Sequence, residues 1–240
     1  MHLIKRDLFS YFCIVFAAVL AAAFSGKVYL ATFAAAEYPD SRPVIILDAG
    51  HGGEDGGAVS PSGVRESGIN LQICVRTDAL LCLLGQPTLL LREEDRSLHS
   101  ESAETISEKK ISDLKNRVSA VNSRSNAILV SVHQNMFHES RYSGAQVFYA
   151  PTPGSDELAD SIQKSLREQL SKENRRQIKP ADSVYLMNHV SCPAVLVECG
   201  FLSNAEECRK LCTPEYQKQI AMVISVETME FMRKVITDEV

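Results

Sequence analysis

Short apolar runs alternate with longer amphipathic stretches from Pro43 onward. Runs rich in β-branched residues predict five strands, over residues 44–47, 88–91, 127–132, 144–150 and 194–197. Apolar residues at helical spacing predict four helices, over residues 69–84, 112–122, 155–171 and 214–235. The polar stretch 97–110 predicts a loop. This alternation is typical of a single α/β domain with a central, mostly parallel sheet flanked by helices, which we place at residues 43–235.

The first 36 residues differ from the rest of the chain. Lys5 and Arg6 precede the run from Leu8 to Phe24, in which Ser10 interrupts the apolar residues. Such a segment is typical of a signal peptide or a short membrane anchor, and both alternatives fit the sequence. Because basic residues before an apolar run stay in the cytoplasm, we expect the domain that follows to be exported.

Polar residues follow three of the predicted strands at the point where each strand ends. The first strand leads into His51, the third into His133 and the fifth into Glu198. Ligands of an open α/β sheet bind at the carboxyl ends of its strands, so we expect these residues to converge if their strands are parallel neighbours. Glu66 lies just before the helix that we expect to begin near Ile69, and it is a fourth candidate.

Two imidazoles and one carboxylate are a typical donor set for a catalytic zinc ion, which keeps one further position for water. A second carboxylate beside such an ion can act as a base, and the spacing alone does not assign the two roles between Glu66 and Glu198. The four residues form no compact motif such as H-E-x-x-H. Each also fits an ordinary role, as a loop histidine or as an acid at a helix N-terminus.

Nucleotide binding and cysteine chemistry fit this sequence less well. The glycine-rich segment 50–57 has Asp55 where the dinucleotide fingerprint needs glycine, and it lacks the Gly-Lys-Ser/Thr of a Walker loop. We interpret its glycines as allowing a tight turn around His51 and leaving room for a bulky substrate. Cys199 follows Glu198 along a strand, where adjacent side chains face opposite sides, so we do not expect a cysteine nucleophile at the site.

Composition and charge narrow the range of partners. With 45% hydrophobic and 23% charged residues, the chain has a globular composition. Three of the 25 basic and one of the 30 acidic residues lie in the first 36, so the remainder carries a net charge of −7, against −5 for the whole chain. We therefore do not expect a broad basic face for nucleic acid. We expect an anchor or a partner, rather than charge, to localise the domain at an anionic envelope surface.

At these residues the sequence resembles the zinc-dependent N-acetylmuramoyl-L-alanine amidases of the Amidase_3 class, over about residues 43–235. Four blocks in the family's order carry the resemblance, at residues 47–53, 65–71, 131–135 and 197–204. Ala49 replaces the usual proline of the first block and Ser67 a common lysine of the second, and neither change removes a ligating atom. Three further stretches, 110–117, 144–149 and 184–187, look like the CwlD branch of endospore formers, which acts in spore cortex synthesis.

The resemblance implies a site, a reaction and a location. His51, Glu66 and His133 would hold one zinc ion, Glu198 would be the catalytic base, and Asn135 is a candidate substrate-binding residue. Asp48 and Asn135 are close enough in sequence to orient the imidazoles. The reaction would be hydrolysis of the amide between N-acetylmuramic acid and L-alanine in peptidoglycan, in the maturation of the spore cortex that forms muramic lactam. The enzyme would act at the outer face of the membrane or in the wall or forespore envelope.

Two other functions remain open alternatives. One is an envelope zinc peptidase that cuts within the stem peptide, and the other is a catalytically dead wall-binding or partner protein. All four metal and catalytic positions are retained, which argues against a dead site. A small acidic domain without wall-binding repeats also favours a partner or activator protein at the envelope, with the N-terminal segment as a membrane contact if it is not cleaved.

Overall fold

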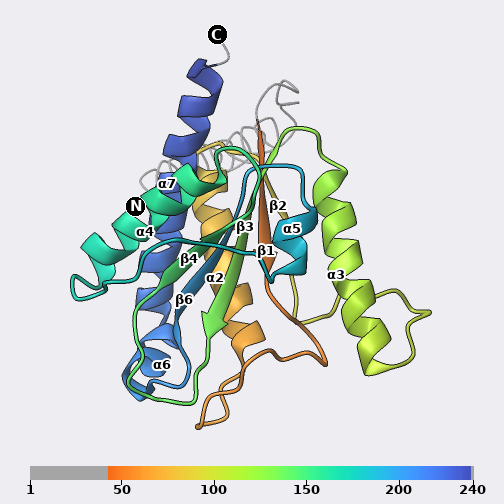
Figure 1. Cartoon of the computed structure of the whole chain (residues 1–240), viewed down its shortest axis with the longest axis vertical. Helices are drawn as coiled ribbons and strands as arrows, with labels where there is room; N and C mark the ends of the chain where they lie inside the picture. The colour runs from red at the N-terminus through yellow and green to blue at the C-terminus, as the bar shows by residue number, and fades with distance from the viewer. Residues whose placement is uncertain (1–42, 239–240) are drawn as a thin grey trace, which may run out of the picture. The chain divides into compact units, whose positions relative to one another are not determined.

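One sheet organises the computed structural model of the protein, which describes residues 43–238 (Figure 1). Its strands are β1 (Val44–Ala49), β2 (Thr88–Leu90), β3 (Ala127–Asn135), β4 (Gln146–Tyr149), β5 (Lys179–Pro180) and β6 (Ala194–Phe201). Their order across the sheet is β2-β1-β3-β6-β4-β5. The first four of these are mutually parallel, and β4 runs antiparallel to β6. The mostly parallel sheet predicted from the sequence is confirmed.

Helices cover both faces of the sheet (Figure 1). They are α2 (Glu66–Leu83), α3 (Ile106–Asn122), α4 (Ser155–Leu170), α5 (Tyr185–His189), α6 (Ala205–Leu211) and α7 (Pro214–Asp238). Helices α2, α4 and α7 pack on one face, and α3 and α5 pack on the other. Among the described residues, no helix combines the length and the hydropathy needed to span a membrane. The predicted export segment, residues 1–36, lies outside the described residues.

Alternate residues of the central strands feed two apolar layers. In β1, Ile45 and Leu47 join the layer under α2, α4 and α7, whereas Ile46 joins the layer under α3 and α5. All three are fully buried. A strand covered on both faces reads as a continuous apolar run, which is why this segment could be recognised without an alternating pattern.

The loop predicted over residues 97–110 is wrong in its second half. Helix α3 begins at Ile106, because Thr105 accepts a hydrogen bond from the backbone N–H of Glu108 and the Glu108 side chain accepts one from the backbone N–H of Thr105. This reciprocal capping box stabilises a polar first turn that carries little hydrophobic signal. Glu66 was placed just before its helix, but it is the first residue of α2. The short elements β5, α5 and α6 were not predicted.

Candidate metal centre

The predicted convergence of the strand ends is present in the structure. Parallel pairing places Asp48 of β1 opposite Ser131 of β3, and His133 of β3 opposite Glu198 of β6. The loop after β1 carries His51, and the start of α2 carries Glu66. Three strand ends and one helix start thus contribute side chains to the same edge of the sheet.

A metal ion is commonly held by three or more histidine, cysteine, aspartate or glutamate side chains. Within the described part of the chain, one such group is arranged to hold an ion, and it consists of His51, Glu66 and His133. One ligand atom from each lies within 4.8 Å of the others. The Glu66 carboxylate bridges the imidazoles, with Oε2 3.4 Å from Nε2 of His51 and Oε1 3.0 Å from Nδ1 of His133. Two imidazoles and one carboxylate match the donors of catalytic zinc sites.

The charges in this group favour a cation between the three side chains. Burial alone would raise the pKa of Glu66, but its hydrogen bond with His133 and the charges of both histidines outweigh burial and lower that pKa to about 2. Burial opposes protonation of His133, yet the hydrogen bond with Glu66 and the charges of Glu198 and Glu66 raise its pKa. The buried carboxylate therefore stabilises positive charge here, whether an imidazolium or a metal ion carries it.

Two glycines make room for this group. A Cβ at Gly50 would lie 2.2 Å from Cε1 and Nε2 of the His133 ring. A Cβ at Gly57, where φ is +68°, would lie 2.6 Å from Glu66 Oε2 and 2.7 Å from Cδ2 of His51. Both positions need glycine because a side chain would displace the ligand atoms. The room predicted around His51 is thus filled by the protein's own ligand side chains.

Two buried arginines fix the loop that carries His51. Arg92, which is 1% exposed, donates to the carbonyls of Ala49 (2.8 Å), Gly50 (3.1 Å) and Ser67 (2.8 Å), and also to that of Glu94. These bonds join the loop after β1 to the start of α2. Guanidinium groups suit this role because they present several donors in one plane.

The second buried arginine is Arg117 of α3. It donates to the carbonyls of Ala49 and His51 and pairs with Asp48 and Asp113. Asp48 was a candidate for orienting an imidazole, but Arg117 and Ser131 occupy its oxygens instead. The buried charge of Asp48 is therefore neutralised by Arg117 rather than used on a histidine.

Asp55 orients the imidazole of His51. Its Oδ2 lies 3.0 Å from Nδ1 of His51, and its Oδ1 lies 3.7 Å from Nζ of Lys110. A carboxylate on one ring nitrogen fixes the proton there and leaves the other nitrogen free to bind a metal. From the sequence, Asp55 only argued against nucleotide binding, because a contact with one ring nitrogen in a loop has no sequence pattern.

Glu198 lies beside the three-residue group and makes no hydrogen bond through its buried Oε2 to any described residue. Burial, with a further contribution from the charge of Glu66, outweighs the attraction of His133 and raises its pKa to about 7. It lines a cavity of about 580 Å³ between the sheet and helices α3 and α5, which His51 and His133 also line. The cavity wall includes the apolar side chains of Ile106, Leu114, Val184, Leu186 and Leu196.

The remaining predicted residues lie nearby in different settings. Cys199 is buried in the apolar layer under α2, as expected from its alternation with Glu198. Asn135 ends β3, and its carbonyl accepts a hydrogen bond from the backbone N–H of Leu202. Its side chain does not line the cavity, so a substrate contact by Asn135 stays a prediction.

Comparison with known proteins identifies the family of this chain. Residues 45–226 match the family model described as N-acetylmuramoyl-L-alanine amidase. The chain belongs to this family, and the resemblance identified from the four sequence blocks is confirmed.

Individual relatives agree with this family and with its CwlD branch. The germination-specific N-acetylmuramoyl-L-alanine amidase of Bacillus subtilis is 36% identical over 187 residues, which cover 78% of each chain. A solved structure of the CwlD amidase from Clostridioides difficile, in complex with the GerS lipoprotein, is 39% identical with a TM-score of 0.77 and covers 80% of this chain and 99% of that one. Another amidase from the same species, strain 630, is 27% identical with a TM-score of 0.70, over 80% and 97% of the two chains.

Proposed function

We propose that the protein hydrolyses the amide bond between N-acetylmuramic acid and L-alanine in peptidoglycan, with one zinc ion held by His51, Glu66 and His133. The observation that carries this proposal is the group of two imidazoles and a carboxylate, beside a second buried carboxylate with a raised pKa. Membership of the amidase family indicates which bond is cleaved, and the geometry of the residue group indicates how it is cleaved.

The residues present fit a zinc ion on two counts. Their donor atoms are those of a catalytic zinc site, and the glycines at positions 50 and 57 leave room for the ligand side chains to approach one another. A zinc ion held there supplies a Lewis acid that polarises the scissile carbonyl and makes water more acidic. Amides are poor electrophiles, so both effects are needed for hydrolysis.

Glu198 moves the proton in this proposal. Its carboxylate accepts a proton from the attacking water as the water oxygen bonds to the carbonyl carbon, and it passes that proton to the alanine nitrogen as the C–N bond breaks. Its buried Oε2, which has no hydrogen-bond partner among the described residues, is available for both acts. Asp55 meanwhile holds His51 in one orientation.

The relatives support a role in the spore cortex and a site of action outside the cytoplasm. One relative is named for germination, and the similar CwlD structure contains a lipoprotein partner. We therefore extend the proposal to cortex maturation with muramic-lactam formation, and to a partner protein at the envelope. Loss of muramic lactam from the cortex of a deletion strain is the expected result, and a cortex of unchanged composition would contradict this role.

Mass analysis of digested peptidoglycan tests the reaction itself. An amidase frees intact stem peptides that begin with L-alanine and leaves muramic acid without a stem, whereas a stem peptidase leaves L-alanine attached to the sugar. Digestion with and without a chelator tests the metal in the same experiment. Full activity after exhaustive chelation would overturn the zinc mechanism, and no activity of the zinc-loaded protein, alone or with envelope extract, would favour a dead binding protein.

A further inference from the structure

An aromatic cluster with one exposed ring, that of Phe137, lies beyond the metal centre and outside the cavity that Glu198 lines. It contains Phe137, Tyr142 and Phe201, with Arg141 and Arg176 against the rings, and we call these five residues the aromatic platform. The rings of Phe137 and Tyr142 meet edge to face with centroids 4.8 Å apart. Tyr142 stacks towards Phe201 at 6.3 Å, and the guanidinium of Arg176 lies 4.4 Å from the centre of the Phe201 ring.

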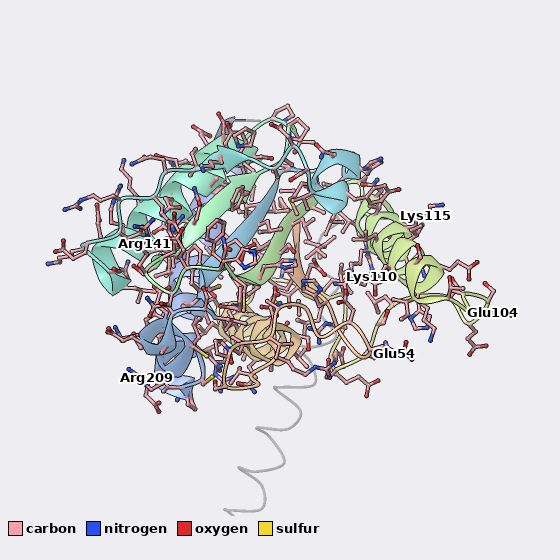
Figure 2. All side chains as sticks on the ribbon, turned by 60° about the horizontal axis from the view of Figure 1, so that its bottom comes forward. Glu54, Glu104, Lys110, Lys115, Arg141 and Arg209 are labelled. Carbon is pink, nitrogen blue, oxygen red and sulfur yellow. The ribbon has the colours of Figure 1, made fainter. Side chains whose placement is uncertain are left out.

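The platform continues directly from the strands that carry the site. Phe137 follows His133 by four residues, so at most about 14 Å of chain separates them. Phe201 follows Glu198 by three residues and pairs in register with Asn135. Figure 2 shows Arg141 of the platform and Lys110 of the cavity wall on opposite sides of the strand ends. The metal centre is therefore flanked by the cavity on one side and the platform on the other.

The loop that carries the platform is held in place by hydrogen bonds. The backbone N–H of Phe137 donates to Ser203 Oγ, and the side-chain amide of Asn204 donates to the carbonyls of Ser140 and Tyr142. Glu207 accepts from the backbone N–H groups of Gly144 and Phe201. The Phe137 side chain nevertheless stays 48% exposed. Met136 beside it is 41% exposed, so the two side chains form a contiguous apolar patch of the kind that marks binding surfaces.

The chemistry of the platform suits an uncharged ligand with apolar faces and polar edges. Arg141 is paired with Glu139 at 2.7 Å, and the charge of Arg176 acts on the nearby Glu207 carboxylate, so neither arginine leaves the platform an unopposed positive charge. Aromatic rings contact the C–H faces of pyranose rings, and guanidinium groups donate to hydroxyl and acetamido oxygens at their edges. When the scissile amide of peptidoglycan lies at the metal centre, the sugar strand extends from it in one direction and the stem peptide in another.

We propose that the aromatic platform is a saccharide subsite, which binds a sugar of the glycan strand next to the muramic acid whose amide is cut. The inference rests on the proposed amidase function and names the part of the substrate that this surface recognises. The cavity on the other side of the metal centre then receives the stem peptide. Phe137 is the residue whose ring is most available for the contact.

Binding of glycan strands without stem peptides tests the subsite separately from catalysis. Such strands contain no scissile amide, so their affinity does not depend on zinc or on the identity of the reaction. Phe137→Ala is expected to weaken their binding about tenfold, which is the upper range for one aromatic contact. Phe137→Tyr keeps a ring and should bind like the wild type. Met222→Ala, which truncates an apolar side chain of α7 with the same 48% exposure, is the matched control and should change nothing.

Kinetics on two substrates extend the test to turnover. For the wild type, kcat/KM should be higher for a muramoyl peptide within a glycan strand than for an isolated muramoyl peptide, and Phe137→Ala should lower only the former, about tenfold. Equal loss on both substrates, or unchanged binding of stemless strands, would overturn the subsite while leaving the amidase function intact. Loss of binding to an envelope protein with unchanged glycan binding would assign the platform to a protein partner and also overturn it.

Discussion

The candidate metal centre has two halves, whose side chains converge on one point from different kinds of backbone structure. His133 and Glu198 lie on β3 and β6, neighbouring strands in the middle of the sheet. His51 lies in a loop after β1, and within the described residues it is the one position other than glycine with a positive φ, at 60°. We call these the strand half and the loop half, and Glu66 at the start of α2 bridges the two histidines.

The difference between the halves is a difference in what fixes their geometry. The strand half is held by backbone pairing on both sides, which is lost only when the sheet unfolds. The loop half is held by side chains, above all Arg92, Arg117 and Asp55. The backbone geometry of the loop half can therefore be changed by single substitutions that leave the sheet in place. The backbone geometry of the strand half cannot be changed in this way.

Loss of either histidine is expected to have the largest effect. His51→Ala and His133→Ala should each abolish stoichiometric zinc and lower kcat/KM by about 10³-fold or more, because the Lewis-acid contribution of the ion amounts to several kcal/mol. Metal analysis of the purified variants measures the first and amide hydrolysis the second. Glu198→Gln is the control, since it should keep zinc and lose turnover. If Glu198→Gln lost zinc while Glu66→Gln retained it, the two carboxylates would exchange roles.

Replacing Arg92 tests whether side chains hold the loop half. Arg92→Met removes the donors of four backbone carbonyls in a buried site, so the free energy of unfolding should fall by about 3 kcal/mol or more. Zinc affinity should fall with it, because the loop carrying His51 is released. Chemical denaturation and zinc titration measure these effects, and Arg209→Met on the surface of α6 is the control. Unchanged zinc affinity in Arg92→Met would show that the loop holds its shape without the arginine.

In the strand half, burial of Glu198 should make the free energy of unfolding of the metal-free protein depend on pH. The folded-state pKa of Glu198 is raised to about 7 above its ordinary value of 4.5, so its contribution to stability is present below pH 4.5 and is lost as the pH rises through 7. Glu198→Gln keeps the neutral form at every pH. Its stability relative to the wild type should increase by about 2 kcal/mol between pH 5 and pH 8.

Denaturation of the metal-free protein at the two pH values provides this measurement. Glu168→Gln, which replaces an exposed carboxylate on α4, should show no such difference between the two conditions. A Glu198→Gln variant with the same relative stability at both pH values would mean that the carboxylate is already ionised, or already solvated, near neutral pH.

The smallest effect is expected at Asp55. Asp55→Asn retains the size of the side chain but weakens its hold on Nδ1 of His51, so zinc affinity should fall about tenfold. Competition with a chelator of known affinity measures this change, and the fold should remain as stable as before. Lys110→Gln removes the charge 3.7 Å from Asp55 and is the control for a purely electrostatic effect of the neighbouring groups. Equal losses in both variants would argue against a specific role for Asp55.

The contrast between the halves also explains what the sequence could predict. Each of the strands β1, β3 and β6 begins with an apolar run of four residues and then carries a polar residue, so His133 and Glu198 of the strand half could be located from the pattern alone. The capped start of α3 was missed, because capping by Thr105 and Glu108 is a local hydrogen-bond pattern without an apolar repeat. The short elements β5, α5 and α6 have too few residues to show a period.

The supports of the loop half could not be predicted for a different reason. Arg92 and Asp55 act through contacts with backbone carbonyls or with a single ring nitrogen, and such partners have no sequence pattern. An arginine in a polar stretch is ordinarily expected to be solvated, whereas Arg92 is buried. The grouping of His51, Glu66 and His133 was expected from the sequence, and the structure adds the contacts of the Glu66 carboxylate with the two imidazoles.

The position of β6 in the sheet has a consequence for the time at which the enzyme becomes complete. This strand comes from the last fifth of the chain, yet it lies between β3 and β4, which are synthesised earlier. The residues of the metal group all precede it, so a growing or partly translocated chain carries them without Glu198. Contacts between distant parts of a chain also form slowly. An unfinished chain therefore lacks the proposed proton acceptor, and under the proposed mechanism the molecule becomes a hydrolase only after β6 has been inserted into the sheet.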